Sequence, residues 1–319
     1  MSRRRVLCFF ALAVLAVAPA ARGDGPQGSA LQSGIGVVSA GGTHRYLALG
    51  VGDFTVVEVV QTRGARLQKW TAYPGSWGIP ALTANGTGGG LSPDGKTLVL
   101  GDTSGGSPSK FLVLDTRTLR QRNQITLNGS FAFDALSPDA SRLYLIQHTS
   151  LDDLSHYIVR SYDLRTDTLQ PGRIADRTQR GWVMSGYPVT RTTNADGGWV
   201  YTLYQKPGGY PFIHALDTIR GVAHCIGLPW TGDQRPLWNI RLGLAADGKT
   251  LTVHWKSGHA WLAVNTTTWR ITHVRPGAFP WAWVVAGTGS VLLVLLAFGG
   301  AVLRARHRGA EGPFLPAAV

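Results

Sequence analysis

One short motif recurs along most of the chain and limits the fold more than any other feature. The segment LSPDGKTLVL at 91–100 joins a short apolar lead-in, a Pro-Asp-Gly turn and an alternating apolar run. This pattern is typical of two strands joined by a tight turn. Related segments are LSPDASRLYL at 136–145, TNADGGWVYTLY at 193–204, LAADGKTLTV at 244–253 and, more weakly, SAGGTHRYLAL at 39–49.

A second turn follows each motif after about twenty residues. These second turns are VLDTRTLR at 113–120, SYDLRTDTLQ at 161–170, HALDTIRGV at 214–222 and AVNTTTWRI at 263–271, and VVEVVQTRGARLQ at 56–68 takes this place in the first unit. The turn aspartates Asp94, Asp139, Asp196 and Asp247 are 45, 57 and 51 residues apart. A period near fifty with four short strands is typical of propeller blades. We therefore predict an all-β fold, a β-propeller of about five four-stranded blades, or six if one divergent blade lacks the motif.

The pairing of LSPDGKTLVL with FLVLDTRTLR at 111–120 resembles the repeats of bacterial YVTN and WD40-like (PD40) β-propellers. The resemblance covers roughly residues 35–274, the predicted propeller ectodomain, and such proteins more often have six to eight blades. The segment at 193–204 departs from the pattern because it lacks Ser-Pro, and Asp139 is followed by Ala140 instead of Gly. The resemblance implies a fold and not a function, since this architecture hosts enzymes, ligand binders and assembly platforms.

The first twenty residues have the composition of a signal peptide. Arg3, Arg4 and Arg5 precede an apolar run, and Ala18-Pro19-Ala20 suits cleavage after Ala20. The start also resembles a twin-arginine signal, but a general-secretion signal is favoured. Residues 21–34 are predicted to be a flexible linker.

A membrane span is predicted at 281–303. Trp281 to Leu303 contains no charged residue and would reach roughly 34 Å as a helix, enough to cross a bilayer. Arg304, Arg306 and Arg308 follow directly and predict a cytoplasmic tail at 304–319, while Trp281 and Trp283 suit the outer interface. The sequence therefore predicts a single-pass protein of the cell membrane with an extracytoplasmic ectodomain. The alternative, a buried core helix, calls for an amphipathic pattern and no flanking arginines.

Small residues recur at four-residue spacing on one face of this span. They are Ala282, Ala286 and Ser290. This spacing permits close helix approach, so a homodimer through the transmembrane helix is a further expectation.

Net charge indicates the kind of partner. Without the six terminal arginines and Glu311, the chain keeps 25 basic and 17 acidic residues, a net charge of about +8. Outside the membrane, anionic envelope polymers and acidic lipid headgroups are more accessible than nucleic acid, and we expect no nucleic-acid partner. A solvated basic surface without a specific partner is the alternative.

Aromatic and basic residues gather in the predicted connections between blades. Such groups can stack on sugar faces and hold acidic groups, so an envelope glycan or a protein is the expected partner. Alternatively, these side chains plug the wide ends of the blades. The candidate ligand-binding residues are Trp77, Arg177, Arg180, Trp182, Arg235 and Trp238.

A polar loop at 148–156, HTSLDDLSH, offers a weaker candidate site. Its two imidazoles and two carboxylates, from His148, Asp152, Asp153 and His156, could hold zinc or another divalent cation. A solvated polar loop is the default interpretation, and no other cofactor is expected.

Enzyme chemistry has little support in the sequence. The region between signal and span contains one glutamate, Glu58, and no Gly-x-Ser-x-Gly or HExxH motif. Cys225 is expected to be a packed strand thiol. The favoured function is therefore a membrane-anchored binding or interaction module of the cell envelope. The alternative is an envelope hydrolase of the lactonase or glycosidase class, for which Asp102, Asp134 and Asp233 would have to converge.

Overall fold

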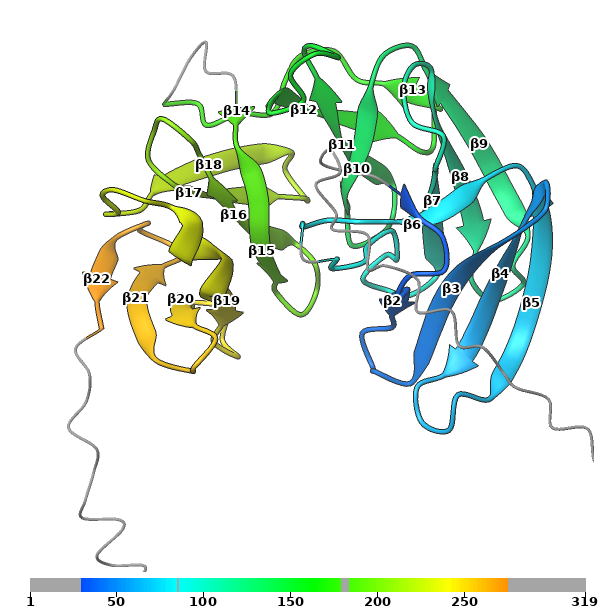
Figure 1. Ribbon diagram of the computed structural model, residues 1–319, viewed down its shortest axis with the longest axis horizontal. Helices are drawn as coiled ribbons and strands as arrows, with labels where there is room; N and C mark the ends of the chain where they lie inside the picture. The colour runs from blue at the N-terminus through cyan, green and yellow to red at the C-terminus, as the bar shows by residue number, and fades with distance from the viewer. Residues whose placement is uncertain (1–29, 85, 179–183, 275–319) are drawn as a thin grey trace, which may run out of the picture.

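The computed structural model describes residues 30–84, 86–178 and 184–274, which form five antiparallel sheets that follow one another along the chain (Figure 1). The first sheet contains β2 (Val37–Val38), β3 (His44–Val51), β4 (Phe54–Gln61) and β5 (Leu67–Pro74). The second contains β6 (Trp77–Pro80), β7 (Thr97–Asp102), β8 (Ser109–Asp115) and β9 (Gln121–Leu127), and β1 (Ala30–Leu31) pairs with β6.

The three remaining sheets repeat this strand order. The third contains β10 (Phe131–Leu136), β11 (Arg142–His148), β12 (His156–Asp163) and β13 (Thr168–Leu169), with β14 (Met184–Ser185) also paired to β12. The fourth contains β15 (Tyr187–Thr193), β16 (Trp199–Gln205), β17 (Phe212–Asp217) and β18 (Val222–Gly227). The 3₁₀ helix η1 (Arg235–Asn239) precedes the fifth, formed by β19 (Ile240–Leu244), β20 (Thr250–Trp255), β21 (Ala260–Asn265) and β22 (Ile271–His273).

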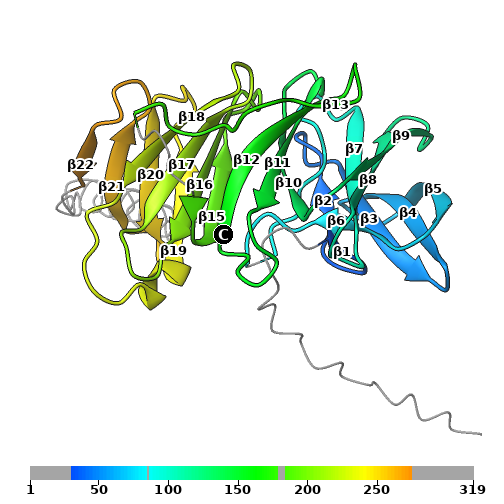
Figure 2. The same ribbon diagram turned by 90° about the horizontal axis from the view of Figure 1, so that it is seen from above.

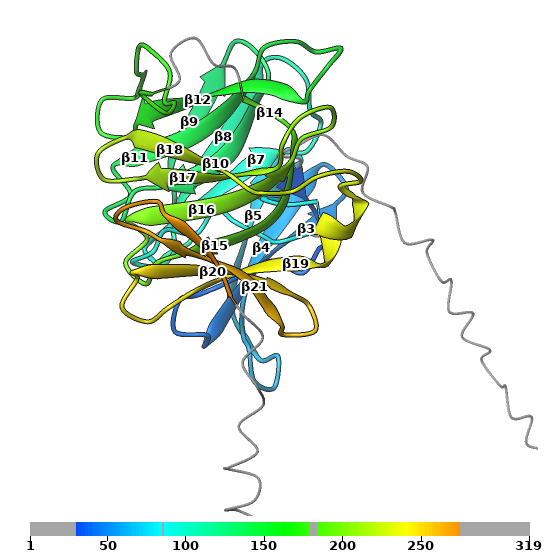
Figure 3. The same ribbon diagram turned by 90° about the vertical axis from the view of Figure 1, so that its left-hand side faces the viewer.

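The sheets follow one another in an arc from the first to the fifth (Figure 1), which appears as a row when the domain is seen from above (Figure 2), and the fifth lies next to the fourth (Figure 3). One shared central cavity is lined by the first strands of sheets one, three and four and by the segment 82–93, which follows the first strand of sheet two. Sheets that succeed one another around a centre, each beginning with its innermost strand, are the blades of a propeller. The all-β prediction and the assignment of two turns to each sheet are confirmed.

The turn aspartates act as predicted. Asp94 Oδ1 accepts a hydrogen bond from the Lys96 backbone N–H at 3.0 Å and from the Ser92 hydroxyl at 2.6 Å. The Ser92 hydroxyl oxygen in turn accepts the Thr97 N–H at 2.9 Å. Each carboxylate therefore fixes its own turn, and Ser137 with Asp139 repeats the arrangement in the third sheet.

One turn departs from the others in its backbone. Gly95, Gly197 and Gly248 follow their aspartates with φ of 70°, 73° and 69°, in the left-handed region that glycine adopts freely. Ala140 takes the same position in the third sheet with φ of 52°. This turn therefore carries the strain of a side chain in the left-handed region.

Apolar residues form a core between each sheet and the next. In β7, Leu98 and Leu100 pack toward the first sheet, whereas Val99 packs toward the third. Further cores join the third sheet to the fourth and the fourth to the fifth. Among the described residues, no core joins the fifth sheet to the first, and these two end sheets are well separated in Figure 1.

The start of the domain corrects a predicted boundary. The sequence assigns residues 30–34 to the predicted flexible linker at 21–34, but Ala30 and Leu31 pair with Pro80 and Ile79. The ordered domain therefore includes Ala30. The predicted signal peptide, the span at 281–303 and the tail lie outside the described residues, and within those residues no helix is long and apolar enough to span a bilayer.

The strain at Ala140 can be tested by exchanging the two residue types between equivalent turns. Ala140→Gly should raise the free energy of unfolding, and Gly248→Ala should lower it by about 1 kcal/mol, the usual cost of a left-handed alanine. A Cβ on Gly248 would meet no atom within 4 Å, so only the backbone conformation is tested. Chemical denaturation measures both changes. If Ala140→Gly leaves stability unchanged or lowers it, the third turn is not strained.

Candidate functional site

The loops form two opposite faces. We call the face with the turns after each sheet's first and third strands the corner face, and the face with the remaining hairpins and the blade connections the connection face. On the connection face, the Gln234 amide donates to the backbone oxygens of Lys206 at 2.8 Å and Gly209 at 2.7 Å. The Thr103 N–H likewise donates to Ser76 O at 2.9 Å. These bonds join blade connections to the hairpins between second and third strands.

The two described aromatic residues of the predicted binding rim differ in exposure. Trp77 is only 6% exposed, belongs to the core between the first two sheets, and donates its indole N–H to Pro74 O at 2.8 Å. Trp77 therefore plugs the end of a sheet and is not presented to a ligand. Trp238 is partly buried against the core of the fourth and fifth sheets, and its role in binding stays a prediction.

Two of the other four predicted residues lie within the described structure, in different blade connections. Arg177 is exposed in the connection after the third sheet, beside the buried Asp176, whose carboxylate accepts the Cys225 N–H at 2.9 Å. Arg235 lies in the connection after the fourth sheet and pairs with Asp233 at 2.7 Å. Arg180 and Trp182 lie outside the described residues.

The polar loop at 148–156 does not assemble a metal site. His148 is buried and its Nδ1 lies 2.9 Å from Leu154 O, whereas His156 is exposed and pairs with Asp153 at 2.7 Å. Asp152 is exposed. Within the described ranges, no three His, Cys, Asp or Glu side chains are grouped to hold a metal ion. His148 instead lines a 380 Å³ cavity between the second and third sheets.

The carboxylates considered for hydrolase chemistry lie in three separate places. Asp134 pairs with Arg191 at 2.8 Å, and both side chains are almost fully buried at the central cavity. Asp102 accepts hydrogen bonds from the Ser104 backbone and hydroxyl, and Asp233 pairs with an exposed arginine. They do not converge on one reacting group.

A buried cysteine lies beside a histidine but is poorly suited to nucleophilic catalysis. Cys225 Sγ lies 3.6 Å from His214 Nδ1, between the third and fourth sheets. Burial raises the pKa of the Cys225 thiol far above its usual value and lowers the pKa of His214 to about 4. At neutral pH the thiol is therefore protonated and the imidazole neutral, without the thiolate that attack requires.

The central cavity is small and narrowed. Its volume is 220 Å³, below the range of roughly 300–1,000 Å³ typical of ligand pockets. At the corner face, Pro93 of the second sheet's turn meets Gly197 of the fourth's. A Cβ at Gly197 would lie 2.1 Å from Pro93 Cγ, so the two turns touch across the centre. The centre thus acts as a packed junction.

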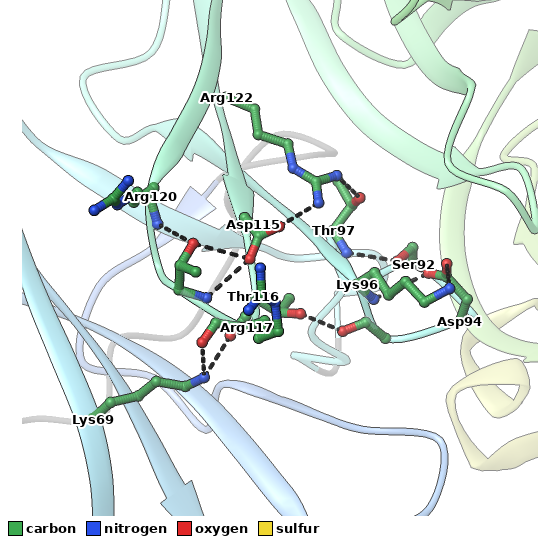
Figure 4. Close-up of polar contacts among 12 residues, drawn as sticks. Lys69, Ser92, Asp94, Lys96, Thr97, Asp115, Thr116, Arg117, Arg120 and Arg122 are labelled. Carbon is green, nitrogen blue, oxygen red and sulfur yellow. Dashed lines mark hydrogen bonds and ion pairs between the residues drawn. The ribbon is translucent and has the colours of Figure 1, made fainter.

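The corner face carries a group of basic side chains around the outer turn of the second sheet (Figure 4). We call it the corner patch, and it comprises Lys69, Lys96, Arg117, Arg120 and Arg122. Lys69 reaches across from β5 and donates to the backbone oxygens of Thr116 at 2.8 Å and Arg117 at 2.6 Å. Arg117 and Arg120 are exposed, and neither side chain has a hydrogen bond or ion pair to the described residues.

The carboxylates near this patch are already engaged. Asp115 pairs with Arg122 and accepts the Thr118 N–H at 2.9 Å, and the hydrogen bond from Arg122 is the largest influence that lowers its pKa. Asp94 accepts hydrogen bonds within its own turn. The guanidinium groups of Arg117 and Arg120 therefore remain available to an anion.

Comparison with known proteins gives only remote likenesses. No family model and no curated protein matches the chain. Among solved structures, TolB from Acinetobacter baumannii is 13% identical with a TM-score of 0.43, over 76% of this chain and 56% of that one. The Dos1 propeller is 11% identical with a TM-score of 0.44, over 76% and 57%. The Cps50 (Swd1) β-propeller domain of Myceliophteria thermophila is 10% identical with a TM-score of 0.42, over 79% and 69%. Similarity this remote gives no information about function.

The carboxylate of Asp139 should make the fold sensitive to acid. Partial burial alone would raise its pKa, but hydrogen bonds from Ser137 and Ser141 and the charge of Arg165 lower it to about 2. Because this pKa is below the unfolded value of about 4, its stabilisation is present above pH 4 and is lost as pH falls toward 2. Asp139→Asn should therefore lower the melting temperature at neutral pH and flatten its decline in acid.

The exposed Asp152 provides the control, since no described residue donates a hydrogen bond to its carboxylate. Asp152→Asn should leave the acid profile unchanged. An Asp139→Asn profile that declines as steeply as the wild type would show that Asp139 does not carry this effect.

Proposed function

We propose that the protein is a membrane-tethered binding module of the cell envelope that presents its corner patch to an anionic component such as an acidic glycan. One observation carries this proposal. The guanidinium groups of Arg117 and Arg120 have no partner among the described residues, because the nearby carboxylates of Asp115 and Asp94 already accept hydrogen bonds from other groups. A planar guanidinium binds carboxylate or phosphate groups through two parallel hydrogen bonds.

The position of the chain ends supports a tether that leaves the corner face pointing away from the membrane. Ala30 lies beside Gly101, close to the connection-face end of β7. The Val274 N–H donates to Trp261 O at 3.0 Å, just after the connection-face hairpin of the fifth sheet. Both ends of the described domain therefore lie on the connection face.

The predicted span would begin close to this face. Trp281 is seven residues beyond Val274, a separation of at most about 25 Å in an extended chain. A domain held this closely would turn its connection face toward the membrane and its corner face outward. An anionic polymer of the envelope would then meet the corner patch first.

The chemistry of the interior favours binding over catalysis. The buried thiol of Cys225 is protonated, and the charge of the buried Asp134 is balanced by Arg191. The three carboxylates considered for hydrolase chemistry lie in separate places. The domain therefore acts through its surface, as a scaffold of stacked sheets that holds loops at both ends.

Binding to a defined acidic glycan tests this proposal. The full-length protein in nanodiscs should bind polygalacturonate and not neutral dextran, and added salt should weaken the complex. Arg117→Glu with Arg120→Glu should weaken binding by at least about tenfold at low salt, which corresponds to about 1.4 kcal/mol. Surface plasmon resonance measures the affinities, and the melting temperature should change little.

Lys249→Glu with Arg270→Glu provides a matched control, since it makes the same charge change at exposed corner-face positions of the fifth sheet. This control should bind nearly as well as the wild type. Equal losses in the two double variants would mean that net charge acts and not the corner patch. No loss in either would exclude the corner face as the binding surface.

A further inference from the structure

Three tryptophans form a cluster at the connection-face end of the fifth sheet. Trp230 comes from the connection after the fourth sheet, Trp255 ends β20 and Trp261 lies in β21. The ring centroids of Trp230 lie 6.2 Å from Trp255 and 5.3 Å from Trp261. All three rings are partly buried against the core of the fourth and fifth sheets, so each has one packed side and one accessible side.

The indole N–H groups distinguish this cluster from a simple plug. Trp77 is buried and its N–H is bonded to Pro74 O. Trp255 and Trp261 donate no indole hydrogen bond to any described residue, and neither nitrogen is a buried atom without a partner. Their N–H groups therefore reach solvent. An aromatic body with an accessible polar edge is the chemistry that favours a membrane–water interface.

Cations border the cluster. Lys256 directly follows Trp255, is exposed, and donates its backbone N–H to Asn239 O at 2.7 Å, which holds the hairpin against η1. Arg235 at the start of η1 has a side chain 85% exposed. Only one acidic side chain, Asp233, pairs with these cations in the described structure. The border therefore keeps a positive charge that suits anionic headgroups.

The cluster lies where the domain ends. Trp261 O accepts the Val274 N–H, so the chain leaves the domain beside the tryptophan rings. In Figure 3, β20 and β21 belong to the sheet at the C-terminal end of the domain. The predicted span begins seven residues later.

We infer that this cluster is a docking surface for the membrane itself. The accessible edges of Trp255 and Trp261 lie among the headgroups, and Lys256 and Arg235 meet lipid phosphates. This inference deepens the proposed function and rests on its tether. A short tether raises the local concentration of bilayer at this surface, so weak interfacial contacts suffice to fix the orientation of the domain. The corner patch would then point away from the membrane.

Two cysteine probes on opposite ends of the fifth sheet test the inference, each introduced as the single cysteine of a Cys8→Ala, Cys225→Ala background. Ser257→Cys lies in the connection-face hairpin and Thr267→Cys in the corner-face turn, and both positions are exposed. Each full-length variant is labelled with an environment-sensitive dye and placed in nanodiscs that contain phosphatidylglycerol and a headgroup spin label. The Ser257 dye should be quenched at least about threefold more than the Thr267 dye, because contact quenching reports only groups at the interface.

Changes to the docking surface should reduce this difference. Lys256→Glu alters an exposed charge without touching the core, and it should lower quenching at Ser257 by about half or more. Trp255→Ser with Trp261→Ser should lower it further, with a melting curve to show that the domain stays folded. Phosphatidylcholine nanodiscs should give weaker quenching than anionic ones.

Resistance of the full-length protein to alkaline extraction from membranes is measured in parallel, because it reports the tether alone. If the protein resists extraction but both dyes are quenched equally or not at all, the docking surface is wrong and the tether stands. If the protein is extracted completely, the tether fails and the docking inference fails with it. Unchanged quenching in Lys256→Glu and in the double serine variant would also contradict docking through these residues.

Discussion

Burial of apolar side chains between successive sheets is the interaction on which the rest of the structure depends. A four-stranded sheet cannot bury two apolar faces alone, so each inner sheet needs a neighbour on both sides. In β7, alternate residues serve two cores, with Leu98 facing the first sheet and Val99 the third. This packing lies on the faces of the sheets, so the fold does not depend on the loops at either end. The loops are therefore free to serve recognition.

The two loop faces follow from the same arrangement but differ in chemistry. On the corner face, aspartates accept the hydrogen bonds of the turns, and Arg117 has no carboxylate partner among the described residues. On the connection face, tryptophans cover the ends of the sheets and the chain enters and leaves the domain. The fold thus places a basic surface on one face and an aromatic surface on the opposite face. With the proposed tether, the aromatic surface would face the membrane and the basic surface would face the envelope.

The sequence predicts local features of this molecule well and distant contacts poorly. The hydrogen bonds of Asp94 involve residues within two positions, so the motif alone predicts the turn. The burial of Trp77 depends on a core shared with the first sheet, and the two-residue strand at Ala30 depends on pairing with Pro80, about fifty residues away. His148 and His156 are close in sequence, but one is buried and the other exposed, so the loop makes no metal site. The basic residues of the corner patch are visible in the sequence at 117–122, but their lack of carboxylate partners among the described residues depends on contacts that only the fold shows.

If packing between neighbouring sheets holds the fold, the end sheets should be less stable than the inner sheets, because an end sheet is covered on one side only. Native-state amide hydrogen exchange measures the free energy of local opening strand by strand. The account predicts the slowest exchange in β11, β12, β16 and β17 of the third and fourth sheets, and faster exchange in β3 and β4 of the first sheet and β20 and β21 of the fifth. All eight strands are paired on both edges for part of their length, so hydrogen bonding alone would not separate them. Equal protection across the five sheets would contradict the claim that packing between successive sheets holds the fold.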